Sequence, residues 1–133
     1  MTFIILMVTA FVALVVYARF TPVVPKPLDA PENITSDQDL TGGFAAVRPF
    51  TGDAATLTKR ITDIVLATPR TRKLSDDPLQ FVTRSRVVGF PDVTTVQVRD
   101  GVLLIHVHLV IGKSDLGVNK ARVLDWLDRL GPL

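Results

Sequence analysis

Two histidines in the C-terminal half of the chain have the spacing of a metal-binding pair. His106 and His108 are two residues apart in an apolar run typical of a β-strand, which places both imidazoles on one face. Such a pair can bind zinc, and Asp92, in the turn before the neighbouring strand, could supply a third ligand. No further histidine, cysteine or cluster of glutamates accompanies them. We therefore expect two surface histidines here, without a metal or any other cofactor.

The loop at 112–119 carries a second group of residues capable of chemistry. Lys113 and Ser114 follow a glycine, as at the end of a phosphate-binding P-loop, but that motif requires an earlier glycine where this chain has Val107. This difference excludes a nucleoside triphosphate site. An anion such as a lipid phosphate stays open as an alternative, because the loop leads into the N-terminal end of a helix, where free N–H groups attract negative charge.

Two interpretations of this loop compete. In the first, polar and basic residues bind an anion or lipid headgroup, and the candidates are Arg84, Arg86, Lys113, Ser114, Asn119 and Arg122. In the second, Asp115 and Ser114 satisfy the N–H groups of the helix themselves. Asn119 then serves as the N-cap, and Gly117 supplies a left-handed turn. The residue types favour the second interpretation, which needs no ligand.

Positive charge is concentrated between Lys59 and Arg86, where seven lysines and arginines accompany three acidic residues. Arg84 and Arg86 are two residues apart in a predicted strand and should share one face. Such a surface suits lipid headgroups or an acidic protein partner, and we expect no nucleic-acid partner. A solvated basic face without a partner explains the same residues equally well.

An uncharged run from Thr2 to Ala18 begins the chain and indicates a membrane protein. About 18 apolar residues at ~1.5 Å each give roughly 27 Å, which just crosses the ~30 Å hydrocarbon core. Arg19 can reach the interface and Pro22 ends the helix, so residues 1–20 are predicted to form a transmembrane anchor. A cleaved signal peptide is the alternative, but no basic residue precedes the apolar run.

The rest of the chain is predicted to form a linker over residues 21–43 and one domain over residues 44–133. Four prolines and four acidic residues in the linker favour a stiff segment followed by a poorly ordered acidic arm. Arg19 and Lys26 are the bases closest to the predicted span, and this bias is too small to orient it. We expect a single-pass protein of the bacterial inner membrane, with its domain on either side.

The domain is predicted to have an α+β fold, with an antiparallel sheet and two amphipathic helices. Apolar residues recur with the helical period between 53 and 68, and again between Asn119 and Gly131. Alternation of residue types predicts strands at 70–74 and 79–88.

The dipeptide Asp100-Gly101 gives the clearest local signal, a two-residue turn that joins strands at 93–99 and 102–111 in a hairpin. If Arg99 lies opposite Val102, the register places three cross-strand pairs on one face, which we assign to the core. These pairs are Val98 with Leu103, Val96 with Ile105, and Thr94 with Val107. His106 and His108 then lie on the other face of the sheet.

Four short runs in the domain together resemble one family of bacterial proteins. They are ATPRTR at 67–72, VTRSR at 82–86, GFPD at 89–92 and GKSDLGVNKARV at 112–123. Across residues 45–130 the chain resembles the domain of unknown function family 1499, and its order of apolar helix, linker and domain looks like that of alphaproteobacterial members. The resemblance implies no activity, cofactor or catalytic residue. Similar sequences tend to have arginine or serine in place of the two histidines, which weakens the metal interpretation.

Together these features predict a membrane-anchored, non-catalytic interaction or accessory protein that docks on a membrane protein complex or on the bilayer surface. The alternative is a module that binds an anion or a lipid headgroup with the two arginines, Lys113 and the 112–119 loop. A small hydrolase or metal-binding enzyme would use Asp92, Asp115 or His106. It is disfavoured, because no converging catalytic partners are visible, and we assign no catalytic residue.

Overall fold

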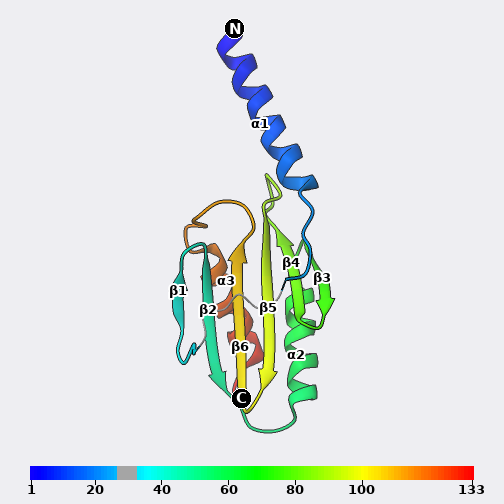
Figure 1. The fold of residues 1–133 in the computed structure, drawn as a ribbon, viewed down its shortest axis with the longest axis vertical. Helices are drawn as coiled ribbons and strands as arrows, with labels where there is room; N and C mark the ends of the chain where they lie inside the picture. The colour runs from blue at the N-terminus through cyan, green and yellow to red at the C-terminus, as the bar shows by residue number, and fades with distance from the viewer. Residues whose placement is uncertain (27–32) are drawn as a thin grey trace.

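The protein consists of a six-stranded antiparallel sheet with two helices on one face and a long helix, α1, that projects from one end (Figure 1). The structure is a computed structural model and describes residues 1–26 and 33–133. The strand order is β1-β2-β6-β5-β4-β3. The elements are α1 Thr2–Phe20, β1 Gln38–Leu40, β2 Gly43–Pro49, α2 Ala54–Leu66, β3 Thr71–Asp76, β4 Leu79–Arg84, β5 Pro91–Arg99, β6 Val102–Leu109 and α3 Val118–Leu130. The predicted α+β fold is confirmed.

The β5–β6 hairpin has the predicted register. Arg99 pairs with Val102, and Asp100 and Gly101 both adopt the positive φ that a tight hairpin turn requires. The three predicted pairs lie opposite one another, and their β6 members are buried in the core. Only the outer ends of the two strands differ from the prediction, since β5 begins earlier, at Pro91, and β6 ends earlier, at Leu109.

Helices α2 and α3 pack their apolar faces against this side of the sheet, as their periodicity predicts. The buried apolar residues are Leu57, Ile61 and Val65 on α2 and Val123, Trp126 and Leu130 on α3. Asp53 caps α2 by accepting the N–H of Thr56, and Gly131 ends α3 with a positive φ. The indole of Trp126 donates to the hydroxyl of Thr68 at 2.8 Å, so that its polar atom is satisfied where it is buried.

Strands β1 and β2 have no counterpart in the sequence prediction. Residues 38–40, which were expected to lie in a poorly ordered acidic arm, pair with β2, and β2 pairs with β6 over its whole length. The arm is also held by Asp37, whose carboxylate accepts hydrogen bonds from the guanidinium of Arg48 at 2.6 and 3.0 Å. This bond holds the pKa of Asp37 below its usual range. The expectation of disorder is therefore wrong for these residues, while residues 27–32 of the predicted linker lie outside the described residues.

Strand β4 is shorter than predicted. It ends at Arg84, because the hydroxyl of Ser85 accepts the N–H groups of Gly89 and Phe90 and closes a turn instead of continuing the ladder. Arg86 lies beyond the strand in this turn. The prediction that Arg84 and Arg86 share a strand face is therefore wrong.

The chain that follows α1 runs along the second face of the sheet, opposite α2 and α3. The side chain of Gln80, which is buried, accepts the N–H of Lys26 at 3.1 Å and donates to its carbonyl at 2.7 Å. The same amide donates to Thr95 on β5. Residues 21–26 are thus bound to the domain.

The last turn of α1 also contacts the domain. Ala18 is fully buried, whereas the apolar residues before it are exposed or partly exposed. The guanidinium of Arg84 donates to the carbonyls of Ala18 at 2.7 Å and Thr21 at 3.1 Å, and the guanidinium of Arg19 donates to the carbonyl of Val87. By length and composition α1 can cross a membrane, a test that a signal sequence also passes.

Candidate functional site

A cavity of about 500 Å³ lies at the end of the sheet from which α1 departs. It is formed between the loop that joins β4 to β5 and the loop that joins β6 to α3. Its lining residues are three arginines, Arg70, Arg86 and Arg122; two acids, Asp92 and Asp115; two serines, Ser85 and Ser114; and an apolar wall that includes Phe90, Leu109, Ile111 and Val118. Three cations beside an apolar wall are suited to an anionic ligand with an apolar part.

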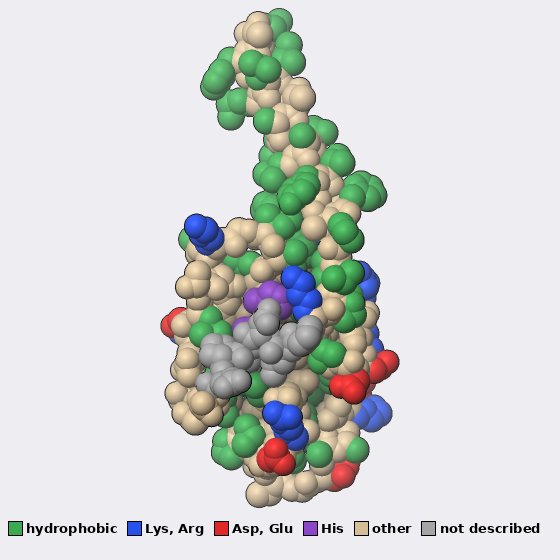
Figure 2. Space-filling view, in the orientation of Figure 1, with side chains coloured by type: hydrophobic (Ala, Val, Ile, Leu, Met, Phe, Trp, Pro, Cys, Tyr) green, Lys and Arg blue, Asp and Glu red, His purple; other side chains and the backbone are tan. Residues whose placement is uncertain are grey.

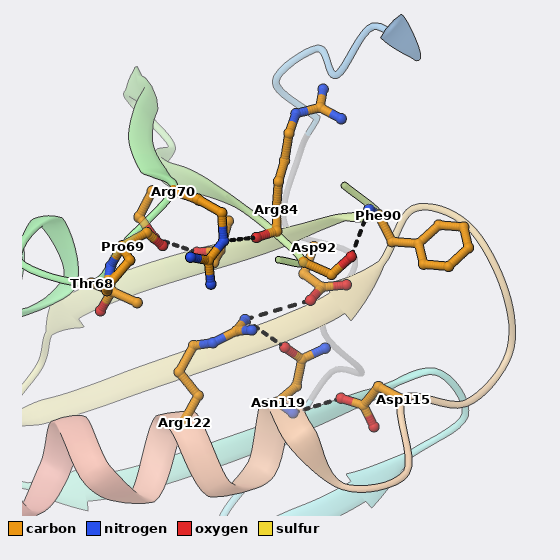
Figure 3. A network of polar contacts seen from close by, with 12 residues as sticks. Thr68, Pro69, Arg70, Arg84, Phe90, Asp92, Asp115, Asn119 and Arg122 are labelled. Carbon is orange, nitrogen blue, oxygen red and sulfur yellow. Dashed lines mark hydrogen bonds and ion pairs between the residues drawn. The ribbon is translucent and has the colours of Figure 1, made fainter. Parts of the chain in front are cut away.

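The floor of the cavity is a polar cluster between β5 and α3 (Figure 3). Arg122 donates to the side-chain carbonyl of Asn119 at 2.7 Å and lies 3.5 Å from one carboxylate oxygen of Asp92. The other carboxylate oxygen of Asp92 and the amide nitrogen of Asn119 are buried without a hydrogen-bond partner among the described residues. The Asn119 amide is near enough to lower the pKa of Asp92, but neither group makes a hydrogen bond of good geometry, so a ligand or a water molecule can still satisfy both.

Burial raises the pKa of Asp92 above its usual range. The positive charge of Arg122, the amide of Asn119 and the hydrogen bond from Arg122 act in the opposite direction, and Asp115 adds a small upward contribution. Loss of solvation is the largest of these effects, because the side chain of Asp92 is only 8% exposed and Arg122 contacts it at long range. Asp92 is thus more easily protonated than an ordinary aspartate.

Asp115 occupies the N-terminal end of α3. Its carboxylate accepts the N–H of Gly117 at 2.9 Å and the N–H of Asn119 at 2.6 Å, and the hydroxyl of Ser114 accepts the N–H of Leu116. Gly117 has a φ of 82°, as predicted. Asp115, Ser114 and Gly117 therefore have the local roles predicted for them, but Asn119 is not the N-cap. It lies in the first turn of a helix that begins at Val118, because Asp115 provides the cap from further upstream.

The structure brings together four of the six residues predicted to bind a ligand. Arg86, Ser114 and Arg122 line the cavity, and Asn119 contacts Arg122 beneath it. Arg84 and Lys113 lie elsewhere.

Figure 3 shows the side chain of Arg84 directed away from Asp92 and Arg122, towards the segment that follows α1. Its removal from water, with repulsion from Arg72, lowers the pKa of this guanidinium below its ordinary value. Lys113 lines a separate hollow together with Asp39 and other residues.

Among the cavity residues that the sequence prediction does not include are Arg70, Ser85 and Phe90. Arg70 has a positive φ of 58°, and its guanidinium donates to the carbonyl of Arg84 at 3.0 Å. Ser85 and Phe90 belong to the turn after β4. All three lie in the runs by which the chain resembles its family, which is the signal that could have identified them.

The residues considered for metal binding or catalysis do not converge. His106 and His108 stack on one face of the sheet with their ring centroids 5.5 Å apart, whereas Asp92 contacts α3 on the opposite face. These three side chains therefore do not come together as a metal site. His106 is buried and His108 partly buried, so the expectation of two surface histidines is wrong. Asp115, the remaining candidate, caps α3. In the part of the chain that the structure describes, no group of three or more such side chains is placed to hold a metal.

The basic residues between 59 and 86 do not form one surface. Lys59 pairs with Asp63 on α2, and Lys73 pairs with Asp76 at the edge of the sheet. Arg60 donates to the carbonyl of Leu130 at the end of α3. The sequence interpretation of this stretch as a single basic face is not supported, although its last members lie at the α1 end of the domain.

Fold and site together define a small α+β domain with an arginine-lined cavity at the end from which its N-terminal apolar helix departs. The chain belongs to the family described as protein of unknown function (DUF1499), which it matches over residues 24–130. The match confirms the resemblance and includes residues 24–26, which are bound to the sheet. No curated protein and no solved structure matches the chain.

Proposed function

We propose that this protein is a membrane-tethered binding module whose end cavity holds an anionic group attached to an apolar body. The observation that carries the proposal is the cavity itself, which three arginines line together with two aspartates and an apolar wall. Guanidinium groups form paired hydrogen bonds with phosphate and carboxylate oxygens, so they suit either anion. The apolar wall gives the same ligand a second, nonpolar contact.

The anchor contributes to this proposal. The contacts of Arg84 and Arg19 make the last turn of α1 part of the folded domain. If α1 were a signal peptide cleaved after residue 21, the guanidinium of Arg84 would lose two of its three carbonyl partners, those of Ala18 and Thr21. The surface that α1 covers at Arg84 would then be exposed. We therefore infer that α1 is retained as the tether.

Asp92 gives the cavity a way to adjust its charge. As a carboxylate it partly neutralises Arg122, and as a carboxylic acid it leaves the full positive charge of Arg122 available to a ligand. Its pKa is already raised by burial, so an incoming anion favours proton uptake. Binding of an anion should therefore strengthen as the pH falls through the pKa of Asp92.

The test compares three probes on the full-length protein in detergent: dihexanoyl phosphatidylglycerol, dihexanoyl phosphatidylcholine and inorganic phosphate. We expect the first to bind most tightly, because it alone has both a net negative charge and an apolar part. Arg86→Gln should weaken its binding about tenfold, equivalent to roughly 1.4 kcal/mol. Isothermal titration calorimetry measures the difference.

Lys113→Gln is the matched control, since Lys113 is an exposed cation of the same end but lines a different hollow. The Lys113→Gln variant should bind phosphatidylglycerol with the same affinity as the unaltered protein. Equal losses in Arg86→Gln and Lys113→Gln would show that the effect is general surface charge. Tight binding of inorganic phosphate alone would instead identify a free anion as the ligand.

The predicted docking on a membrane protein complex is the second candidate function. It rests on the tether and the exposed surface of the domain, and no contact in the structure favours a particular protein. Extraction of the tagged protein from native membranes in mild detergent, with identification of proteins present in fixed proportion, tests it. A stoichiometric companion that survives Arg86→Gln would support this candidate over the binding module.

A further inference from the structure

Two loops at the α1 end of the domain expose apolar side chains at their tips. These loop tips are Val87 in the β4–β5 loop and Val110, Leu116 and Val118 in and around the β6–α3 loop. Leu116 is 95% exposed and Val87 is 67% exposed. Both loops lie at the end of the sheet from which α1 departs (Figure 1). Apolar side chains gathered on an exposed surface typically mark an interaction site.

The backbone conformation of Leu116 is one that disfavours leucine. Leu116 has a φ of 56°, in the left-handed region that bulky residues avoid and that glycine and asparagine adopt more easily. Its side chain gains no packing in the domain, because it is almost fully exposed. Leucine at this position thus neither suits the backbone conformation nor packs inside the protein, which favours a contact of this side chain with a partner outside the domain.

The β4–β5 loop is held beside the point at which α1 ends. The guanidinium of Arg19 donates to the carbonyl of Val87 at 3.1 Å, and Gly89 packs directly on the aliphatic part of Arg19. Arg84 fixes the same turn through the carbonyl of Gly89 at 3.1 Å. The backbone of Val87 is therefore bound directly by the side chain of Arg19, the residue that follows the apolar span.

The charges around these tips match a membrane interface. Arg19 follows the span, and Arg86 and Lys113 are exposed in the two loops. Figure 2 shows the hydrophobic side chains of α1 reaching the domain, with cationic side chains near the junction and the visible acidic side chains farther from α1. Cations next to apolar tips suit anionic lipid headgroups above the hydrocarbon core.

We propose that the α1 end of the domain rests on the lipid bilayer, with Val87 and Leu116 in the interface. The proposal deepens the proposed function, because it rests on α1 as a retained anchor, but it requires no ligand in the cavity. The cavity lies between the two loops, so it opens onto the headgroup layer when the loops contact the bilayer. Its ligand then comes from the membrane, as the headgroup of an anionic lipid.

The absence of cysteine from the chain allows a direct test. Single variants Val87→Cys, Leu116→Cys and Asp100→Cys are labelled with a nitrobenzoxadiazole fluorophore in the full-length protein. Each is reconstituted into vesicles of phosphatidylcholine and phosphatidylglycerol that contain a spin-labelled lipid quencher. We expect several-fold stronger quenching and a blue-shifted emission at positions 87 and 116 than at position 100, in the exposed turn at the opposite end.

Equal quenching at the three positions would overturn the proposal and would favour contact of these loops with a protein. A second variant tests the fixed orientation, since Arg84→Leu in the Leu116→Cys background should reduce quenching by releasing the domain from α1. These outcomes are independent of the anion-binding test. If Arg86→Gln abolishes phosphatidylglycerol binding in solution while the quenching pattern persists, the loops contact the bilayer whether or not the cavity is filled. If phosphatidylglycerol binds the cavity but quenching is equal at the three positions, the proposed function stands and the bilayer contact is wrong.

Discussion

The two ends of the sheet differ in charge and in the way their turns are stabilised. The turns far from α1 carry four acidic residues, Asp53, Asp76, Asp77 and Asp100, and the loops at the α1 end carry the exposed cations Arg70, Arg86 and Lys113. The far turns close by local signals, such as the Asp100-Gly101 turn and the Asp53 cap. The loops at the α1 end are also closed by local hydrogen bonds, to Ser85 and Asp115, but this end is in addition joined to a segment distant in sequence by the contacts of Arg84 with Ala18 and Thr21.

This difference separates a part of the molecule that folds by local rules from a part built around a junction and a cavity. Local turns need few partners, so they tolerate change. The α1 end holds a buried carboxyl, an arginine bound to three carbonyls, and an exposed leucine with positive φ. Features of this kind cluster where a protein contacts something else.

The largest expected effect is that of Arg84→Leu. The change leaves the carbonyls of Ala18, Thr21 and Gly89 without their donor and should lower the free energy of unfolding by about 2 to 3 kcal/mol. Arg99→Leu, in the exposed far end, should cost less than about 0.5 kcal/mol. The fluorescence of the single, buried Trp126 reports unfolding in both variants. Similar losses would mean that the junction is not special.

The next effect tests the packing of α1 on the domain with two matched glycines. Gly89 and Gly112 both have positive φ, so alanine strains the backbone at either position. A Cβ at Gly89 would lie 2.7 Å from Cγ of Arg19, whereas a Cβ at Gly112 would have no neighbour within 4 Å. Gly89→Ala should therefore cost roughly 1 kcal/mol more in thermal unfolding.

Arg19→Ala provides the control for this comparison, because it removes the atom with which the new Cβ collides. In the Arg19→Ala background the two alanine variants should have similar stabilities. A difference that persists would place its cause inside the loop and not at the contact with α1.

A smaller effect is expected from Asp92→Asn. Because the folded pKa of Asp92 is raised, ionisation costs stability, and this cost appears as the pH rises from the unfolded pKa, about 3.9, through the folded value. The variant should therefore be more stable than the unaltered protein at neutral pH, and this advantage should disappear in acid. Melting temperatures measured across this pH range test the sign. A less stable variant at neutral pH would show that pairing with Arg122 outweighs the loss of solvation.

The smallest effect is that of Leu116→Asn. Asparagine adopts the left-handed region more easily than leucine and loses no packing here, so the stability should rise by a few tenths of a kcal/mol, about 0.5 at most. The same variant should weaken contact of the β6–α3 loop with vesicles. Calorimetric unfolding measures the first quantity, and lipid quenching of a fluorophore at Val87→Cys in the same background measures the second. A loss of stability would mean that the leucine packs inside the protein.

Local sequence signals predict much of the fold. The register of the hairpin follows from Asp100-Gly101 and alternation, and α2 and α3 follow from their apolar period. Strand β2 has no such signal, because Gly43–Pro49 contains adjacent alanines and ends in proline, and its pairing with β6 is decided by tertiary contact.

The site is less predictable, because it depends on which way side chains point at the ends of strands. Arg84 and Arg86 differ by two positions, but the turn begun by Ser85 breaks the alternation between them. Arg84 therefore binds the α1 junction, while Arg86 reaches the cavity. Asn119 was misassigned as a cap because Asp115, four residues upstream, already accepts its N–H. Such choices depend on loop geometry, which residue types alone do not determine.

The binding of residues 21–26 to the sheet has a mechanical consequence. Gln80 holds both backbone groups of Lys26, and Arg84 holds Ala18 and Thr21, so the span and the sheet are joined at several points within a short stretch. A membrane helix changes its tilt when the thickness of the bilayer changes. If α1 spans the bilayer as we propose, such a tilt would turn the sheet with it, and the thickness of the bilayer would set the angle at which the cavity meets the lipid.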